Sequence, residues 1–187
     1  MSDLTTVQQI AVMALPVLLA ITVHEAAHGY AARKFGDNTA MMMGRLSLNP
    51  LKHIDPVGTV LVPVVVYLTT GFLFGWAKPV PVNFRNLRNP RRDMALVAAA
   101  GPGANLLMAI AWAVIARLAL AYHQGVGGDS GQVPFFIVSV GIAGIVINVI
   151  LMVINLLPIP PLDGGRVLAG LVPLSASRWL DRIEPFG

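Results

Sequence analysis

The sequence contains no cysteine. This absence excludes disulfide bonds, metal sites built on thiolate ligands, and enzymes that use a cysteine nucleophile. Charged residues are also scarce, at 12% of the 187 residues, which is about half the fraction found in an ordinary soluble domain. Basic residues are missing before the first apolar block, so that block lacks the positive region of a cleavable signal peptide. We therefore expect it to be a retained helix.

Apolar residues make up 56% of the chain, and the mean hydropathy is +0.71. They form four blocks, near residues 7–32, 57–75, 94–121 and 134–157. Three of these blocks are long enough to cross a hydrocarbon core of about 30 Å as helices, at about 1.5 Å per residue. The blocks lack the polar face at helical period that a buried helix of a soluble protein shows. We predict an all-α polytopic integral membrane protein, with residues 1–187 forming a single membrane-embedded domain.

The basic residues suggest a topology. Of the 13 lysines and arginines, all except Arg117 lie in segments 33–56 and 76–93 or in the tail after the fourth apolar block. The positive-inside rule places these three regions in the cytoplasm. The first two can share a side only if the block at 57–75 enters the membrane and returns. We predict three full spans with the N-terminus outside and a re-entrant or short segment at 57–75, which implies a protein-lined cavity. A four-span model in which 57–75 crosses is the alternative.

The motif HEAAH occupies residues 24–28, directly after a long uncharged apolar run. On a helix His24 and His28 lie one turn apart on the same face, a spacing that lets two imidazoles bind one zinc ion. Glu25 is offset by one position, where it can take a proton from zinc-bound water, whose pKa zinc lowers to about 7. Charged groups in a membrane segment cost a few kcal/mol each and usually mark function. A purely structural polar cluster is the alternative.

A catalytic zinc site takes three protein ligands and keeps a fourth position open. Asp163, in the stretch PPLDGG, is the best candidate for the third ligand. It follows the fourth apolar block, whose cytoplasmic end is expected to lie near HEAAH in the three-span topology. In the four-span model Asp163 and HEAAH would lie on opposite sides, so a shared zinc site favours a re-entrant second block. The other candidates are His53, Asp55 and Glu184; of these, Asp55 precedes a proline and is typical of a turn or cap residue.

Three motifs together resemble one known family. HEAAH on a membrane helix, GPGAN opening another and NLLPIPPLDGG closing a third are similar, in this order, to the site-2 protease family of intramembrane zinc metalloproteases. GRLSLNPLKHIDPVGT and GWAKPVPVN further resemble its compact prokaryotic members, which lack a PDZ domain. The resemblance covers most of the chain. It implies one zinc ion on His24, His28 and Asp163, with Glu25 as the catalytic base. Family members often continue with a further transmembrane helix, whereas this sequence ends at Gly187, so truncation stays open.

Several small or amide side chains are further candidates. Asn105, near the start of the third block, and Asn155, near the end of the fourth, are both expected at the level of the zinc site. An amide there can hold the substrate carbonyl or stabilise the developing oxyanion; an interhelical hydrogen bond, worth about 1 kcal/mol, is an equal alternative. Asn148 is assigned to packing. Gly101 and Gly103 are predicted to let helices approach closely.

The stretch KPVPV at 78–82 is predicted to form a small extended or β element. An extended edge near the zinc ion can pair with an unwound substrate strand by β-addition, and a plain proline-rich connector is the alternative. The basic residues of 78–92 are expected to set orientation and to touch anionic lipid. Aromatic residues are too sparse there to favour nucleic-acid binding.

These observations predict an intramembrane zinc metalloendopeptidase in a prokaryotic cell (inner) membrane, with its active site toward the cytoplasmic side. It would cleave the transmembrane segment of a protein substrate, for regulated intramembrane proteolysis, by Glu25-assisted attack of zinc-bound water. The expected partners are this substrate and the lipid bilayer, without nucleic acid. Two alternatives remain: a membrane metal transporter, which needs no general base at Glu25, and an inactive scaffold that retains the fold.

Overall fold

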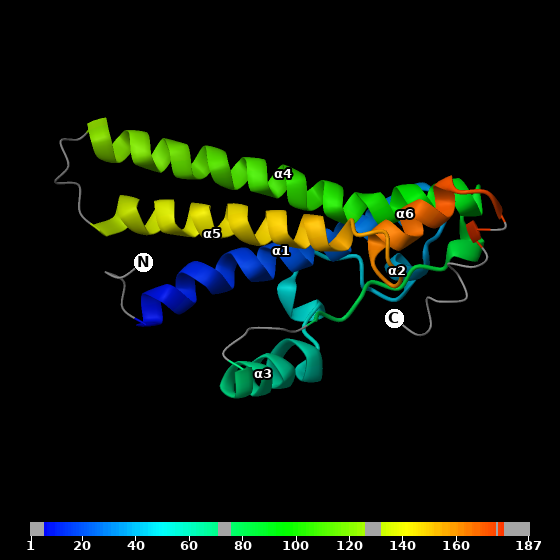
Figure 1. Ribbon diagram of the computed structural model, residues 1–187, viewed down its shortest axis with the longest axis horizontal. Helices are drawn as coiled ribbons and strands as arrows, with labels where there is room; N and C mark the ends of the chain where they lie inside the picture. The colour runs from blue at the N-terminus through cyan, green and yellow to red at the C-terminus, as the bar shows by residue number, and fades with distance from the viewer. Residues whose placement is uncertain (1–5, 71–75, 126–131, 175, 178–187) are drawn as a thin grey trace.

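The computed structural model describes residues 6–70, 76–125, 132–174 and 176–177. Within these residues all regular structure is helical and no strand occurs. Three long helices lie side by side: α1 (Thr6–Lys34), α4 (Pro90–Gly125) and α5 (Gln132–Asn155) (Figure 1). Each contains a stretch long and apolar enough to cross a membrane. The prediction of an all-α polytopic membrane protein is therefore confirmed.

Small and aromatic side chains join the three helices. Val12 of α1 is buried against Val140 and Ala143 of α5, and Trp112 of α4 packs against this cluster. The outer faces of the same helices carry exposed leucine and isoleucine side chains, such as Leu107. Close packing of small residues inside and apolar residues outside is what a helix bundle in lipid requires, because lipid supplies no hydrophobic force between helices.

The helices differ from the prediction in two places. α4 begins at Pro90, four residues before the apolar block, because its basic first turn is also helical. Proline suits the first helical position, and the Asp93 carboxylate accepts the N–H of Asn89 at 2.8 Å, which caps the start. A further helix, α6 (Asp163–Leu171), was not predicted. It packs against α4, and together with the short α2 (Thr39–Met42) it lies at one end of the bundle.

The described part of the second apolar block, residues 57–70, does not form a long helix. Helical turns over Pro56–Leu61 run into α3 (Val62–Thr70), which stands apart from the three long helices (Figure 1). Asp55 caps this start, as predicted, because its carboxylate accepts the first N–H groups of the turns. The turns have six residues and α3 has nine, and together they make roughly 22 Å of helix, which is shorter than the hydrocarbon core of about 30 Å.

Two hydrogen bonds bring the chain back to the place where this block starts. The N–H of Trp76 donates to the carbonyl of Gly58 at 2.9 Å, and the hydroxyl of Thr59 donates to the carbonyl of Trp76 at 2.8 Å. The two ends of the block therefore lie side by side, while residues 71–75 are outside the described part. This arrangement confirms a re-entrant or short segment and does not fit a simple crossing.

The segment 76–83 that follows has neither helix nor strand structure. The predicted β element is thus a single segment that has no partner strand in the described part of the chain. It is held at both ends: the guanidinium of Arg45 donates to the carbonyl of Lys78 at 3.0 Å, and the Asp37 carboxylate accepts the N–H of Asn83 at 2.8 Å. These contacts fix the segment beside the end of the bundle that carries α2 and α6.

Candidate metal centre

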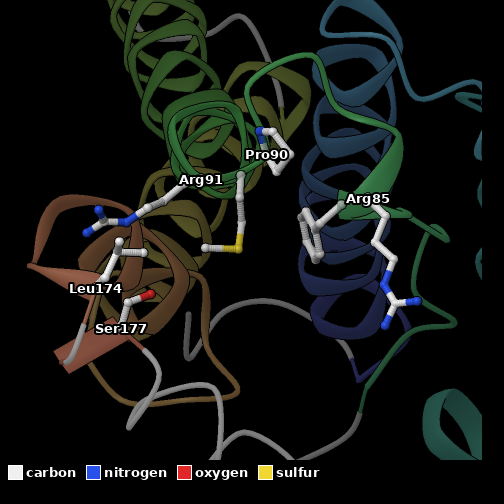
Figure 2. Close-up of a pocket in the computed structure, with 7 residues that line it drawn as sticks. Arg85, Pro90, Arg91, Leu174 and Ser177 are labelled. Carbon is white, nitrogen blue, oxygen red and sulfur yellow. The ribbon is translucent and has the colours of Figure 1, made fainter.

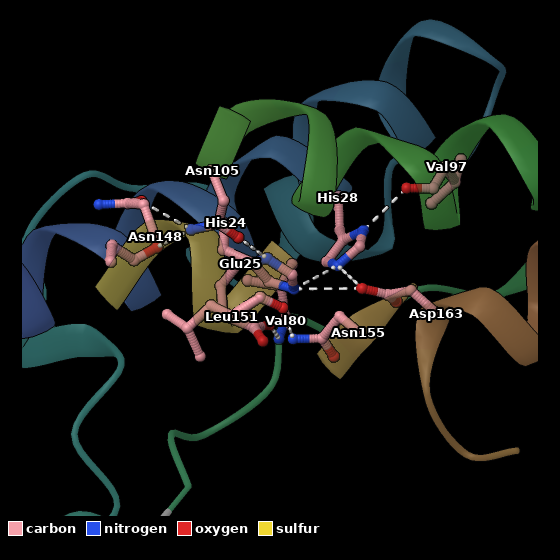
Figure 3. A network of polar contacts seen from close by, with 11 residues as sticks. His24, Glu25, His28, Val80, Val97, Asn105, Asn148, Leu151, Asn155 and Asp163 are labelled. Atoms are coloured by element: carbon pink, nitrogen blue, oxygen red, sulfur yellow. Dashed lines mark hydrogen bonds and ion pairs between the residues drawn. The ribbon is translucent and has the colours of Figure 1, made fainter. Parts of the chain in front are cut away.

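His24, His28 and Asp163 converge on one point (Figure 3). The Nε2 atoms of the two histidines are 3.0 Å apart, and each lies 3.2 Å from Oδ2 of Asp163. His24 and Asp163 are buried, and His28 is partly buried. The structure therefore brings together the three side chains that the sequence singled out as ligands.

The chain after α5 explains how Asp163 reaches the histidines. α5 ends at Asn155, the prolines that follow carry the chain around a tight turn, and Asp163 opens α6. The Gly164 backbone lies directly against the carbonyls of Leu156 and Leu157, where a Cβ atom would collide. Only glycine fits such a close approach, so the predicted bend toward the site depends on it.

The backbone of α4 passes directly over the two histidines at Gly101. A Cβ atom at this position would lie 2.6 Å from Cε1 of His24 and would also collide with Nε2 of His28. At Gly103 a Cβ atom would meet nothing within 4 Å. Of the two glycines predicted to permit close packing, Gly101 does so at the site and Gly103 does not.

The other ring nitrogen of each histidine is already bound. Nδ1 of His28 faces the carbonyl of Val97 at 2.8 Å, and Nδ1 of His24 faces Oδ1 of Asn105 at 2.6 Å. Both partners are oxygen acceptors, so each Nδ1 carries the proton and each neutral ring offers a bare lone pair at Nε2. Backbone or amide acceptors of this kind commonly orient metal-binding histidines.

The donor set fits a metal cation. Two Nε2 lone pairs and a carboxylate oxygen face one another at 3.0–3.2 Å, and Oδ2 of Asp163 is buried without a hydrogen bond. Three acceptors this close repel one another unless a cation lies between them. Two imidazole nitrogens with one carboxylate oxygen are a ligand set that zinc accepts in catalytic sites.

Glu25 lies beside the three converging side chains, but it does not point at them as a fourth ligand. Its Oε2 accepts a hydrogen bond from the N–H of Val80 at 2.7 Å. Glu25 and the ligands line one cavity of about 530 Å³, together with Trp76, Pro79 and Asn155. The base candidate, the candidate metal ligands and the segment 76–83 thus share one cavity.

The remaining ligand candidates lie elsewhere. His53 is 2% exposed, and its Nε2 faces the carbonyl of Ser47 at 2.8 Å. Asp55 caps the turns before α3, and Glu184 lies outside the described residues. Among the described residues, only the side chains of His24, His28 and Asp163 converge in this way.

Comparison with known proteins supports the same assignment. The sequence model of peptidase family M50 matches residues 122–183, which include Asp163. A Bacillus subtilis protein named putative zinc metalloprotease YwhC is 40% identical over 177 residues, covering 94% of this chain and 75% of that protein. The chain belongs to peptidase family M50, the site-2 protease family. A Mycolicibacterium smegmatis protein named putative zinc metalloprotease Rip2 is 33% identical, covering 81% of this chain and 53% of that protein. No solved structure matches this chain.

The two asparagines that the sequence singled out occupy different places in this M50 peptidase. Asn105 is fully buried and binds His24, so it lies behind this candidate ligand and is absent from the cavity lining. Asn155 lines the cavity, and its amide donates to the carbonyl of Leu151 one turn earlier at 3.0 Å. Asn148 was assigned to packing, but it binds Asn105 at 2.9 Å; a single sequence carries no signal for such a contact across helices.

A second cavity of about 520 Å³ in the M50 peptidase lies between the first turn of α4 and the residues after α6 (Figure 2). Its lining includes Arg85, Arg91 and Ser177, but no histidine or carboxylate. The two guanidinium groups point in opposite directions in Figure 2 and do not converge on one anion. This cavity therefore offers neither a metal site nor a built anion site.

Proposed function

We propose that this M50 peptidase is an intramembrane zinc metalloendopeptidase. The observation that carries this proposal is the convergence of two histidine Nε2 atoms and the Asp163 carboxylate beside Glu25, in a bundle of three helices fit to cross a membrane. A hydrolase needs a general base next to its metal ligands, and Glu25 stands there. The substrate is the transmembrane segment of another protein, cleaved within or close to the bilayer.

His24, His28 and Asp163 would hold one zinc ion, through Nε2, Nε2 and Oδ2. Bound zinc would supply Lewis acidity toward the scissile carbonyl and would acidify a water molecule. Glu25 takes the proton from the attacking water and passes it to the leaving amine. Its carboxylate is held for this task by the N–H of Val80, which occupies Oε2 and leaves Oε1 for the water.

The segment 78–82 supplies a surface for the substrate. It lines the cavity next to Glu25 through Pro79 and Val80. Residues 79 and 81 are prolines, so only Val80 and Val82 have N–H groups between Lys78 and Asn83. The N–H of Val80 is bound to Glu25, so the N–H of Val82 is the one that this stretch offers to a substrate. An unwound substrate strand lies along this edge by β-addition, and the Asn155 amide, which lines the same cavity, stabilises the developing oxyanion.

The orientation in the cell membrane follows from charge. The three basic regions face the cytoplasm by the positive-inside rule, which places the site toward the cytoplasmic side and the N-terminus outside. Residues 1–187 act as one catalytic domain in a prokaryotic cell membrane.

The test is a comparison of membrane-protein fragments between cells with the wild-type chain and cells with Glu25→Gln. Fragments that end within transmembrane segments are expected only with the wild type. A metal transporter does not need the base, so an identical fragment pattern in both strains would contradict proteolysis.

A further inference from the structure

We propose that Asn148 sets the tautomer of His24 through Asn105, and thereby fixes which ring nitrogen of His24 is offered to the metal. Asn148 touches neither the three ligands nor the cavity, and it acts as a positioning residue. The inference rests on the metal site of the proposed function, but not on the reaction that the site performs.

A continuous chain of hydrogen bonds crosses three helices (Figure 3). The amide nitrogen of Asn148 in α5 donates to the carbonyl of Gly144 at 2.8 Å. Oδ1 of Asn148 accepts from the amide nitrogen of Asn105 in α4 at 2.9 Å. Oδ1 of Asn105 accepts from Nδ1 of His24 in α1 at 2.6 Å. This series of hydrogen bonds therefore ends at His24, one of the three proposed ligands.

The Gly144 carbonyl, at the end of the series away from His24, fixes which atom donates and which accepts in each hydrogen bond. A backbone carbonyl can only accept a hydrogen bond, so Asn148 must turn its NH₂ group toward Gly144 and its oxygen toward Asn105. Asn105 must then turn its NH₂ group toward Asn148 and its oxygen toward His24. His24 must in turn carry its proton on Nδ1, which leaves the lone pair of Nε2 facing Asp163 and His28.

Burial disfavours other orientations of the two amide groups. Asn105 and Asn148 are both 0% exposed, so bulk water does not replace either partner. The NH₂ group of Asn105 also lies 3.4 Å from the carbonyl of Ala20. A rotated Asn105 amide would place its oxygen against two acceptors at once, Oδ1 of Asn148 and the carbonyl of Ala20. Asn148 provides the shorter of the two contacts that hold the Asn105 NH₂ group in place, at 2.9 Å against 3.4 Å.

Without Asn148 the Asn105 NH₂ group loses an acceptor, and the orientation that points its oxygen at His24 is less stable. If it rotates, its NH₂ group donates to Nδ1 of His24, and the ring proton moves to Nε2. A protonated Nε2 cannot bind a metal. Loss of Asn148 is therefore expected to lower metal affinity although no ligand has changed.

The test uses Asn148→Leu and Asn148→Ser in the full chain. Leucine removes the amide, whereas serine keeps a bond to the Gly144 carbonyl but holds its oxygen one bond nearer the backbone, away from Asn105. Ser139→Ala is the matched control, because Ser139 is a buried polar residue of α5 that donates to the carbonyl of Phe135 at 3.0 Å and has no link to His24.

The first measurement is the ¹⁵N NMR signature of His24 in metal-free protein, assigned by its loss in His24→Gln. The wild type and Ser139→Ala are expected to show the Nδ1–H form, and both Asn148 variants a raised share of the Nε2–H form. The second is the dissociation constant for Zn²⁺. It should rise about tenfold in both Asn148 variants, the lower end of the 10–100-fold cost of losing an outer-sphere partner, and stay unchanged in Ser139→Ala.

A double-variant cycle separates positioning from general damage. In an Asn105→Leu background, Asn148→Leu is expected to change zinc affinity no further, because the link to His24 is already broken. Additive losses in that background, or an unchanged tautomer and affinity in both Asn148 variants, would overturn the inference. If the wild type shows the expected tautomer and zinc affinity but cleaves no membrane protein, the proposed function fails and this inference stands.

Discussion

The Glu25 carboxylate accepts a hydrogen bond from the backbone N–H of Val80 at 2.7 Å. This contact joins the base candidate on α1 to the segment 76–83, although 55 residues separate the two in the chain. The position of the base therefore depends on how firmly that segment is held. Its far end is held by Asp37, which accepts the N–H of Asn83 and the side-chain NH₂ of Asn86.

Replacing Asp37 with asparagine should detach this anchor. Asparagine has one side-chain acceptor in place of two, so the N–H of Asn83 would face an NH₂ group and lose its partner. We expect a loss of about 1–3 kcal/mol of stability, the cost of a buried unsatisfied group, and reduced cleavage with unchanged zinc content. Thermal unfolding and metal analysis check this; loss of zinc together with cleavage would contradict a role confined to the segment.

The same carboxylate predicts a pH dependence. Burial raises the pKa of Asp37, but hydrogen bonds from Thr39, Asn86 and Asn83 outweigh it and lower the pKa below its ordinary value of 3.8. A lowered pKa in the folded state means that the stabilisation is present above about pH 4 and is lost as the pH falls through the lowered value. Unfolding curves of the wild type should therefore approach those of Asp37→Asn below pH 4. A constant difference between the two down to pH 2 would contradict this.

Gly101 offers a test of the packing of α4 on the ligands. Gly101→Ala adds a Cβ atom that collides with the rings of His24 and His28, so zinc affinity should fall at least tenfold. Gly103→Ala is the matched control two residues away, where a Cβ atom meets nothing within 4 Å. Alanine favours helix over glycine at both positions, so helix propensity cannot explain a difference. Equal zinc affinity of the two variants would show that α4 does not press on the ligands.

The ligand set is tested by Asp163→Ala and His53→Ala. We expect Asp163→Ala to lose zinc, because it removes one of three ligands, and His53→Ala to retain it, because His53 binds the carbonyl of Ser47 instead. Zinc content after dialysis distinguishes them. Zinc retained in Asp163→Ala and lost in His53→Ala would reverse the assignment.

The re-entrant course of 57–75 predicts a labelling pattern. Because the chain has no native cysteine, single cysteines placed at Lys52, Arg88 and Tyr122 report without background. All three positions are exposed. A membrane-impermeant thiol reagent should label Lys52→Cys and Arg88→Cys from the cytoplasmic face and Tyr122→Cys from the other. Labelling of the first two from opposite faces would contradict the return of the chain at Trp76.

The sequence was enough to predict the three spans and the residues that converge, because hydropathy, the spacing of HEAAH and the stretch PPLDGG are local signals. It did not predict α6, because two glycines in its first turn disfavour a helix and only packing against α4 offsets them. It also did not predict the hydrogen bond between Glu25 and Val80, because the donor is a backbone N–H, a group that nearly every residue has whatever its side chain. The link from Asn148 to His24 runs across three helices, and no periodicity reports the distance between helices.

The most direct measurement of the central claim compares purified wild-type protein with Glu25→Gln in lipid, using a transmembrane-segment substrate and zinc analysis of the same samples. Glutamine keeps an oxygen that accepts from Val80 but cannot take a proton. We predict one zinc ion per chain in both proteins, with cleavage in the variant reduced about 10²–10⁴-fold, the usual contribution of a general base. Cleavage by Glu25→Gln at the wild-type rate with zinc bound would contradict the account.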